Sequence, residues 1–146
     1  MKPSIPLIAL ALLSCSPAAS DGPDISVTNA WARATLPGKP TSAAYFTIAN
    51  RGGGEDALLA VTSTSGTAEV HSTSMEGGIM RMRKLDRLQV PGGESVALKP
   101  GGTHVMLLEL AKPLAPGQKI DLTLRFEKSP QQTVAAQVRD SSGDNM

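Results

Sequence analysis

The sequence predicts a small all-β domain, folded as an antiparallel sandwich or barrel. Segments with the composition of strands, each about six residues long, recur from residue 25 onward, and turn signals separate nearly all of them. Glycine and proline number 14 and 11, which favours many short elements joined by turns over a few long helices. No window of this part of the chain keeps an apolar helical stripe beyond two turns.

The individual strands are predicted from loose alternation and from their β-branched and aromatic residues. Residues 25–35 alternate apolar and polar side chains, and residues 43–49 are rich in strand-forming types before a glycine-rich turn at 50–54. Later segments lie between turns that contain glycine, proline or both. In chain order, the nine predicted strands are 25–35, 43–49, 57–63, 68–74, 79–85, 95–98, 105–110, 120–126 and 133–138.

Composition and charge exclude several classes of function. With 146 residues the chain has room for one ordinary domain. Its formal net charge of +1 argues against nucleic acid as a partner, since binding to phosphates needs a clear basic excess. A single cysteine excludes an internal disulfide and a CxxC redox pair.

The N-terminal segment has the features of an export signal. Lys2 supplies a short positive region, and residues 5–13 form an apolar stretch too short to cross a bilayer as a permanent helix. Two cleavage sites are consistent with the small residues that follow. One lies after the run at 18–20, and the other, which we favour, lies before Cys15, because residues 12–15 resemble the bacterial lipobox.

On the lipoprotein interpretation Cys15 carries lipid and the residues after it form a tether. Ser16, which follows directly, is not the acidic residue that usually retains lipoproteins in the inner membrane, so the outer membrane is expected for a Gram-negative source. We therefore expect residues 1–24 to be signal peptide, lipobox and tether, residues 25–138 to be the β-domain and residues 139–146 to be a disordered tail.

Histidine and methionine gather in one quarter of the chain. Both histidines and four of the six methionines lie between His71 and Met106, while the other two are the first and last residues. A single methionine in a β-domain usually fills space, and a single histidine is more often hydrogen-bonded than a ligand. Their co-occurrence favours a metal site, because thioethers and imidazoles together suit Cu(I) in an oxidising compartment.

The expected strand geometry supports a shared site. His104 and Met106 are two residues apart on a strand, so both side chains leave the same face with Cα atoms about 6.6 Å apart. Met80 and Met82 repeat this relation, and a hairpin is expected to bring His71 alongside them. We expect these pairs to meet near strand ends at one rim of the domain.

The spacing of four of these residues resembles a known family signature. His71, Met82, His104 and Met106 follow the H-x10-M-x21-H-x-M pattern of the periplasmic copper chaperones called PCu(A)C. Further segments look like that family from about residue 27 to residue 138. They are residues 30–35 with 37–38, and residues 43–46, 69–71, 78–83, 90–93 and 98–106.

The resemblance implies a fold, a ligand set and a role. The fold would be a cupredoxin-like (Greek-key) β-sandwich, and one Cu(I) would be bound by His71, Met82, His104 and Met106. The copper would be delivered to the Cu(A) centre of cytochrome c oxidase, so the expected partners are a subunit of that enzyme or a second copper chaperone. A periplasmic monomer is expected. Some relatives carry a His- and Met-rich C-terminal extension, which this chain lacks apart from Met146.

Other interpretations remain open at this stage. Copper buffering without a dedicated recipient would use the same residues, and a metal-free immunoglobulin-like interaction module would fit the strands alone. Catalysis is not expected, because no Ser-His-Asp order and no metal-water set with a carboxylate base is present. Electron transfer of the blue-copper type would need a cysteine thiolate beside two histidines.

Four other features receive secondary predictions. Met80 is expected to cover the ion as an apolar lid, and Met75, in a predicted loop, is a spare thioether or an exposed side chain. Trp31 is predicted to anchor the core between sheets. The basic residues between 81 and 87 are expected to form a solvated strand face, with docking to an acidic partner as the alternative.

Overall fold

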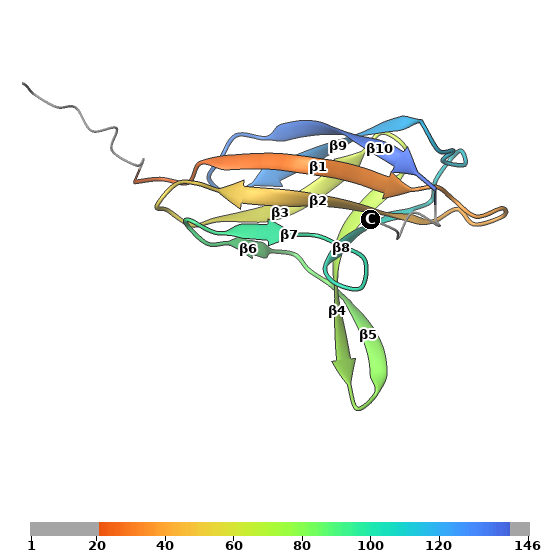
Figure 1. Ribbon diagram of the computed structural model, residues 1–146, viewed down its shortest axis with the longest axis horizontal. Coiled ribbons are helices and arrows are strands. Elements are labelled where there is room, and N and C mark those ends of the chain that lie inside the picture. Colours follow the sequence, from red (N-terminus) through yellow and green to blue (C-terminus); the bar gives the residue numbers. More distant parts are fainter. Residues whose placement is uncertain (1–20, 141–146) are drawn as a thin grey trace, which may run out of the picture.

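A computed structural model describes residues 21–140, and this part of the chain contains strands and no helix. The all-β prediction is therefore confirmed (Figure 1). The strands are β1 (Ile25–Arg33), β2 (Ser42–Asn50), β3 (Asp56–Ser63), β4 (Thr67–Glu76), β5 (Ile79–Lys84), β6 (Leu88–Val90), β7 (Ser95–Ala97), β8 (His104–Leu108), β9 (Lys119–Phe126) and β10 (Gln132–Arg139). Nine of them match the predicted strands to within two residues at each end. The three-residue β6 was not predicted, because it is too short to show a period of two.

The strands form one continuous sheet that curls over itself. Their order is β5-β4-β8-β2-β1-β10-β9-β3-β6, and β7 also pairs with β2. All pairs are antiparallel except that of β1 with β10, which is parallel. The curl places β2 on one side of the core and β9 with β3 on the other (Figure 1).

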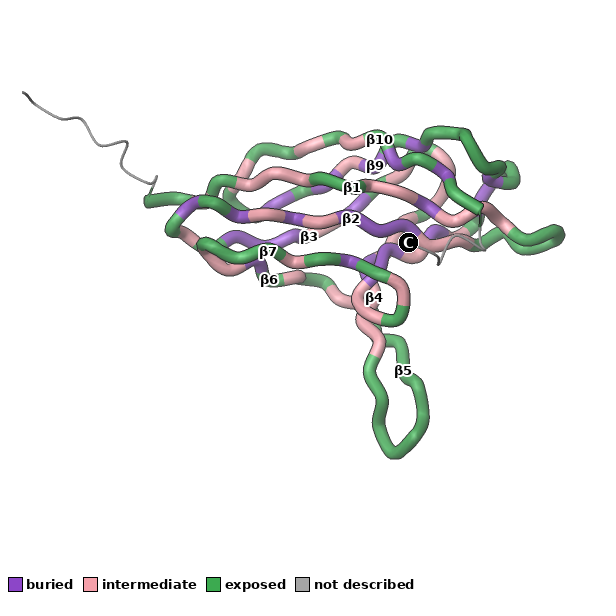
Figure 2. The backbone as a smooth tube through the Cα atoms, in the orientation of Figure 1, coloured by how far each residue is buried: buried purple, intermediate pink, exposed green. Residues whose placement is uncertain are grey.

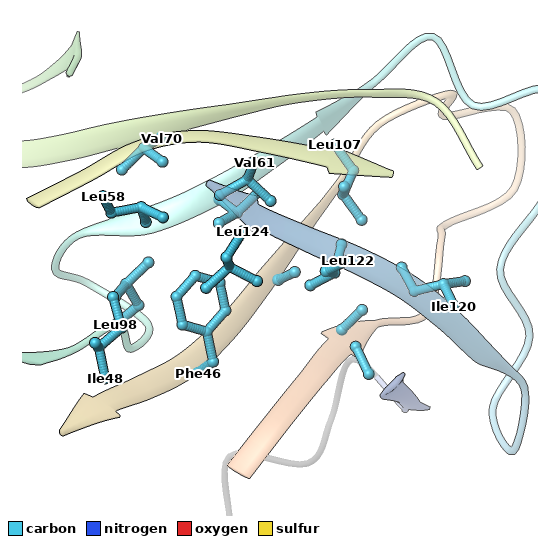
Figure 3. Close-up of a cluster of buried hydrophobic side chains, with 14 of the residues drawn as sticks. Phe46, Ile48, Leu58, Val61, Val70, Leu98, Leu107, Ile120, Leu122 and Leu124 are labelled. Carbon is cyan, nitrogen blue, oxygen red and sulfur yellow. The ribbon is translucent and has the colours of Figure 1, made fainter. Parts of the chain in front are cut away.

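The core is built from alternate residues of these facing strands. In β9 the buried residues are Ile120, Leu122, Leu124 and Phe126, and the residues between them are more exposed, as expected for a strand with one face toward the core. Figure 3 shows Leu124 beside Phe46 of β2 and Ile48 of β2 next to Leu98, all within one buried cluster. Burial of each such side chain stabilises the fold by about 1.5–3 kcal/mol.

The prediction that Trp31 anchors the core is wrong, and a β-bulge explains the error. Ile25 and Val27 pack against the core, but the register of β1 against β2 shifts between Thr28 and Trp31, where Asn29 adopts a positive φ of 56°. The extra residue inverts the alternation, so Ala32 enters the core and Trp31 points away from it. There the indole packs on Tyr45, with ring centroids 4.5 Å apart.

One hairpin projects from the body of the domain. The distal part of β4 and all of β5 extend beyond the rest of the sheet, and every residue of β5 is exposed (Figures 1 and 2). Gly77 and Gly78 close the hairpin, both with positive φ, as a two-residue turn between antiparallel strands requires. Met75 therefore lies within β4, and its predicted place in a loop is wrong. The two-residue turn lets the strands continue almost to the tip.

A buried carboxylate ties β3 to the loop after β9. Asp56 is 1% exposed, and its oxygens accept hydrogen bonds from the backbone N–H groups of Ala57, Lys128 and Ser129 at 2.8–2.9 Å. Burial by itself raises the pKa of Asp56, but the hydrogen bonds from Ser129, Lys128 and Ala57 together hold the pKa below its usual range. Because the folded-state pKa is lowered, this group stabilises the fold above its unfolded-state pKa, and the contribution is lost as the pH falls through the folded-state pKa.

Replacing Asp56 with Asn should therefore lower the free energy of unfolding in a pH-dependent way. We expect a loss of about 1–3 kcal/mol near pH 7, because one N–H loses its acceptor and the charge is removed. The difference should shrink as the pH falls below about 4. Urea unfolding of the wild type and Asp56→Asn between about pH 7 and pH values below about 4 measures this difference in the free energy of unfolding. Asp121→Asn, at an exposed position, is the control. An equal difference at all pH values would contradict the role given to the Asp56 charge.

Candidate metal centre

The candidate ligands lie on three neighbouring strands, β5, β4 and β8. His71 of β4 is directly opposite His104 of β8 on one side and Lys84 of β5 on the other. Side chains that are directly opposite share a face of the sheet, as do residues two positions apart on one strand. The same face therefore carries both histidines, the four methionines between residues 75 and 106, Glu69, Thr73 and Lys84.

The two imidazoles form the centre of this face. The rings of His71 and His104 are stacked, with centroids 6.2 Å apart and an angle of 27° between their planes. His104 begins β8 and is buried, whereas His71 lies in the middle of β4 and is partly exposed. The expected position near a strand end is thus correct for His104 and wrong for His71, because β4 runs on into the projecting hairpin.

A backbone carbonyl orients the ring of His104. Its Nδ1 lies 2.9 Å from the carbonyl oxygen of Gly102, a geometry in which Nδ1–H donates to the oxygen. The Nε2 atom of a neutral ring then keeps its lone pair. A hydrogen bond from one ring nitrogen that leaves the other for a metal is the usual arrangement of histidine ligands.

A carboxylate, which the sequence analysis did not identify as part of the site, orients His71. Nε2 of His71 lies 3.0 Å from Oε2 of Glu69, and Nζ of Lys84 lies 3.4 Å from Oε1 of the same carboxylate. The hydrogen bond with His71, assisted by Lys84, holds the pKa of Glu69 below its usual range. With Nε2–H donating to Glu69, Nδ1 of His71 is the nitrogen left for a ligand. The signal in the sequence was the i, i+2 spacing of Glu69 and His71, which places them on one face.

The two candidate thioether ligands flank the histidine pair from opposite sides. Met106 is opposite Glu69 and two residues beyond His104, is partly buried, and lines a groove of about 280 Å³ with Arg33, Ala43 and others. Met82 is opposite Thr73, two residues beyond Lys84, and is exposed. Met82 is therefore a diagonal neighbour of His71 on the next strand.

The secondary candidates lie farther out on the same face. Met75 is directly opposite Met80, and both are exposed near the tip of the hairpin. Four residues of strand separate Met75 from His71, or about 13 Å. Met80 is therefore not seated over the histidine pair. Cys15, the predicted lipidation site, lies outside the described residues.

Two observations delimit the site within residues 21–140. In this range no three His, Cys, Asp or Glu side chains form a group that could hold a metal ion. Beside the two imidazoles this face carries the thioethers of Met82 and Met106 and the carboxylate of Glu69, which pairs with His71 and Lys84. A larger groove of about 660 Å³ lies between segments 34–40 and 110–116, and none of the candidate ligands lines it.

Residues 21–140 contain no helix that could span a membrane.

Comparison with known proteins gives consistent matches over most of the chain. The family model described as "Putative lipoprotein LpqE-like" matches residues 25–138. "Putative lipoprotein Lxx21020" of Leifsonia xyli subsp. xyli (strain CTCB07) is 33% identical over 152 residues, covering 97% of this chain and 90% of that protein.

Solved structures of copper-related domains are similar in fold. The copper-bound PCuAC domain from PmoF2 has a TM-score of 0.68 and 27% identity, covering 80% of this chain and 92% of that domain. The apo form of DR1885 from Deinococcus radiodurans has a TM-score of 0.62 and 26% identity, covering 97% of this chain and 98% of that protein. The Cu(I) form of DR1885 has a TM-score of 0.64 and 25% identity, covering 86% of this chain and 83% of that protein.

The hydrogen bonds of the two histidines predict opposite tautomers in the neutral rings. His104 should carry its proton on Nδ1 and His71 on Nε2, because Gly102 and Glu69 are the respective acceptors. Long-range ¹H–¹⁵N correlation spectra of the metal-free protein at alkaline pH measure this directly. Glu69→Ala should remove the preference of His71 and leave that of His104. An Nε2–H tautomer at His104 would contradict the assigned geometry.

Proposed function

The chain belongs to the LpqE-like family and has the all-β, cupredoxin-like fold of PCu(A)C domains, and on this premise we propose that it is an exported copper(I) chaperone. We propose that His71, Met82, His104 and Met106 bind one Cu(I) as cargo. The observation that carries the proposal is the register of β4 with its two neighbours. It sets His71 opposite His104, with Met106 on β8 and Met82 on β5 on either side of the pair. Family membership and the fold agree with the resemblance identified from the sequence.

The chemistry of the donor set favours the reduced ion. Thioethers are soft donors that bind Cu(I), and imidazole is a suitable partner. All four ligands are neutral, so they leave the charge of Cu(I) uncompensated and add nothing that particularly favours Cu(II). The nearby charges of Glu69 and Lys84 are paired with each other. A site of this kind holds Cu(I) and can release it by exchange of thioether ligands, without a change of oxidation state.

The four proposed ligands differ in how firmly the fold holds them. His104 and Met106 alternate with Val105 and Leu107, which are completely buried, so β8 fixes their positions. Met82 lies on β5, whose residues are all exposed. An acceptor protein can therefore approach the ion from the side of Met82 and replace that thioether first. We propose that the acceptor is the Cu(A) site of cytochrome c oxidase or a second copper chaperone.

Replacement of single ligands by near-isosteric residues tests the ligand set. Met82→Leu and Met106→Leu keep apolar volume and should change the free energy of unfolding by less than about 1.5 kcal/mol. Each removes one sulfur donor and should weaken Cu(I) binding at least about tenfold, or about 1.4 kcal/mol. His71→Ala should also lower the affinity. Anaerobic titration against a chromophoric Cu(I) probe measures these effects.

Met80→Leu is the matched control, because Met80 is two residues from Met82 on the same face and equally exposed. It should keep a one-to-one site with a modest change in affinity. If Met80→Leu abolished this site and Met82→Leu did not, the assignment of Met82 would be wrong. Anaerobic mixing of the Cu(I)-loaded protein with isolated acceptor domains then separates delivery from buffering, since a buffer would give no preferential transfer.

We further propose that the mature protein is tethered to a membrane by lipid on Cys15 and faces the periplasm. The lipobox-like residues 12–15 and the similarity to a lipoprotein support this proposal. In a Gram-negative host the wild type should fractionate with the outer membrane, and Cys15→Ser should abolish lipidation. Mass spectrometry of the mature N-terminus provides the check. A mature protein that begins at Asp21 without lipid would contradict the tether.

A further inference from the structure

The tip of the β4–β5 hairpin exposes apolar side chains that have no packing role in the domain. Met75, Met80 and Met82 are 66%, 62% and 58% exposed, and none of them belongs to the hydrophobic core. Figure 2 shows this hairpin as an exposed projection from the sheet. The usual explanation of a methionine in a β-domain, that it fills space in the core, therefore does not apply to these three residues.

The hairpin register brings two of these thioethers together. Met75 is directly opposite Met80, and the two-residue turn at Gly77 and Gly78 fixes this pairing. Opposite residues of an antiparallel pair have Cβ atoms about 4.5–5.5 Å apart. Two methionine side chains at this separation can place both sulfur atoms on one ion, because each side chain has three rotatable bonds.

The same face is electrically neutral between the tip and the histidines. Thr73 and Met82 form the next opposite pair toward His71. Arg81 and Arg83 occupy the alternate positions of β5 and so point to the other face, where Arg81 lies 3.7 Å from the carboxylate of Glu76. The nearest charged side chains on the methionine face are Lys84 and Glu69, which pair with each other. A cation that moves along this face therefore meets no positive charge that would repel it and no unpaired carboxylate that would hold it before it reaches the histidine pair.

We propose that Met75 and Met80 form an outer thioether site for Cu(I), through which the ion enters or leaves the inner site. Two soft neutral donors suit Cu(I), and without imidazole they should bind it more weakly than the inner set. Met82, two residues from Met80 along β5, is the donor that both sites can reach. The ion would pass from the outer pair to Met82 and then to His71 by exchange of dative bonds, with no electron transferred. The inference rests on the proposed function, since the outer pair is useful only if the inner site carries copper.

The test follows the methionine methyl groups during Cu(I) loading. The full domain, with ¹³C-labelled methionine methyls assigned from single Met→Leu variants, is titrated anaerobically with Cu(I) beyond one equivalent. The first equivalent should shift the methyl signals of Met82 and Met106. The second should shift those of Met75 and Met80. Met75→Leu/Met80→Leu should lose the second binding event and keep the first, and these exposed positions make loss of the fold no concern.

Ile79→Leu is the matched control, because it changes an exposed apolar residue at the same tip without removing sulfur. It should keep both binding events. If the second equivalent left the Met75 and Met80 methyls unchanged, the outer site would be refuted while the inner site stood. If the double variant lost the second event and transferred copper to an acceptor as fast as the wild type, the transfer role would be refuted. If the first equivalent failed to shift Met82 and Met106, the proposed function itself would fail.

Discussion

The pairing of His71 with His104 across β4 and β8 is the constraint on which the candidate site depends. Because side chains alternate across a strand with a period of two, this register places Glu69, Thr73, Met75 and Met106 on one face, and the register of β4 with β5 adds Met80 and Met82. A slip by one residue would turn His71 to the other face and bury a different set of side chains. Val70, Val105 and Leu107 are buried at the alternate positions, so the hydrophobic core itself fixes the register.

The site joins two parts of the molecule with different surroundings. β8 lies between β4 and β2 and contributes buried residues to the core, whereas β5 is the exposed end of the sheet. Ligands on β8 are held by packing, and those on β5 are open to a partner. Orientation of the imidazoles comes from a backbone carbonyl at His104 and from a carboxylate at His71. Because these hydrogen bonds already restrict the orientation of the rings, the imidazoles lose less conformational freedom when they bind an ion.

Prediction from the sequence succeeded where local patterns determine the structure. It failed where the way in which strands pair changes which face a side chain takes or which neighbours it meets. The strands outside β6 were predicted because glycine and proline mark their ends. Trp31 was predicted to lie in the core because a large aromatic side chain usually anchors one, but the bulge at Asn29 turns it to the other face of β1. The i, i+2 spacing of Glu69 and His71 was visible in the sequence, but the contact of Glu69 with Lys84 depends on the pairing of β4 with β5.

The sequence by itself determined the all-β class, the export signal as a prediction, and the spacing of two histidines and two methionines that resembles a copper chaperone. These properties depend on composition, turn residues, periodicity and residue spacing, all of which can be read directly from the sequence. The tertiary structure decided that His71 faces His104, that Met106 is partly buried while Met82 is exposed, and that Met75 and Met80 are opposite each other. Strand order and register set these relations, and both result from the packing of residues far apart in the chain around one core.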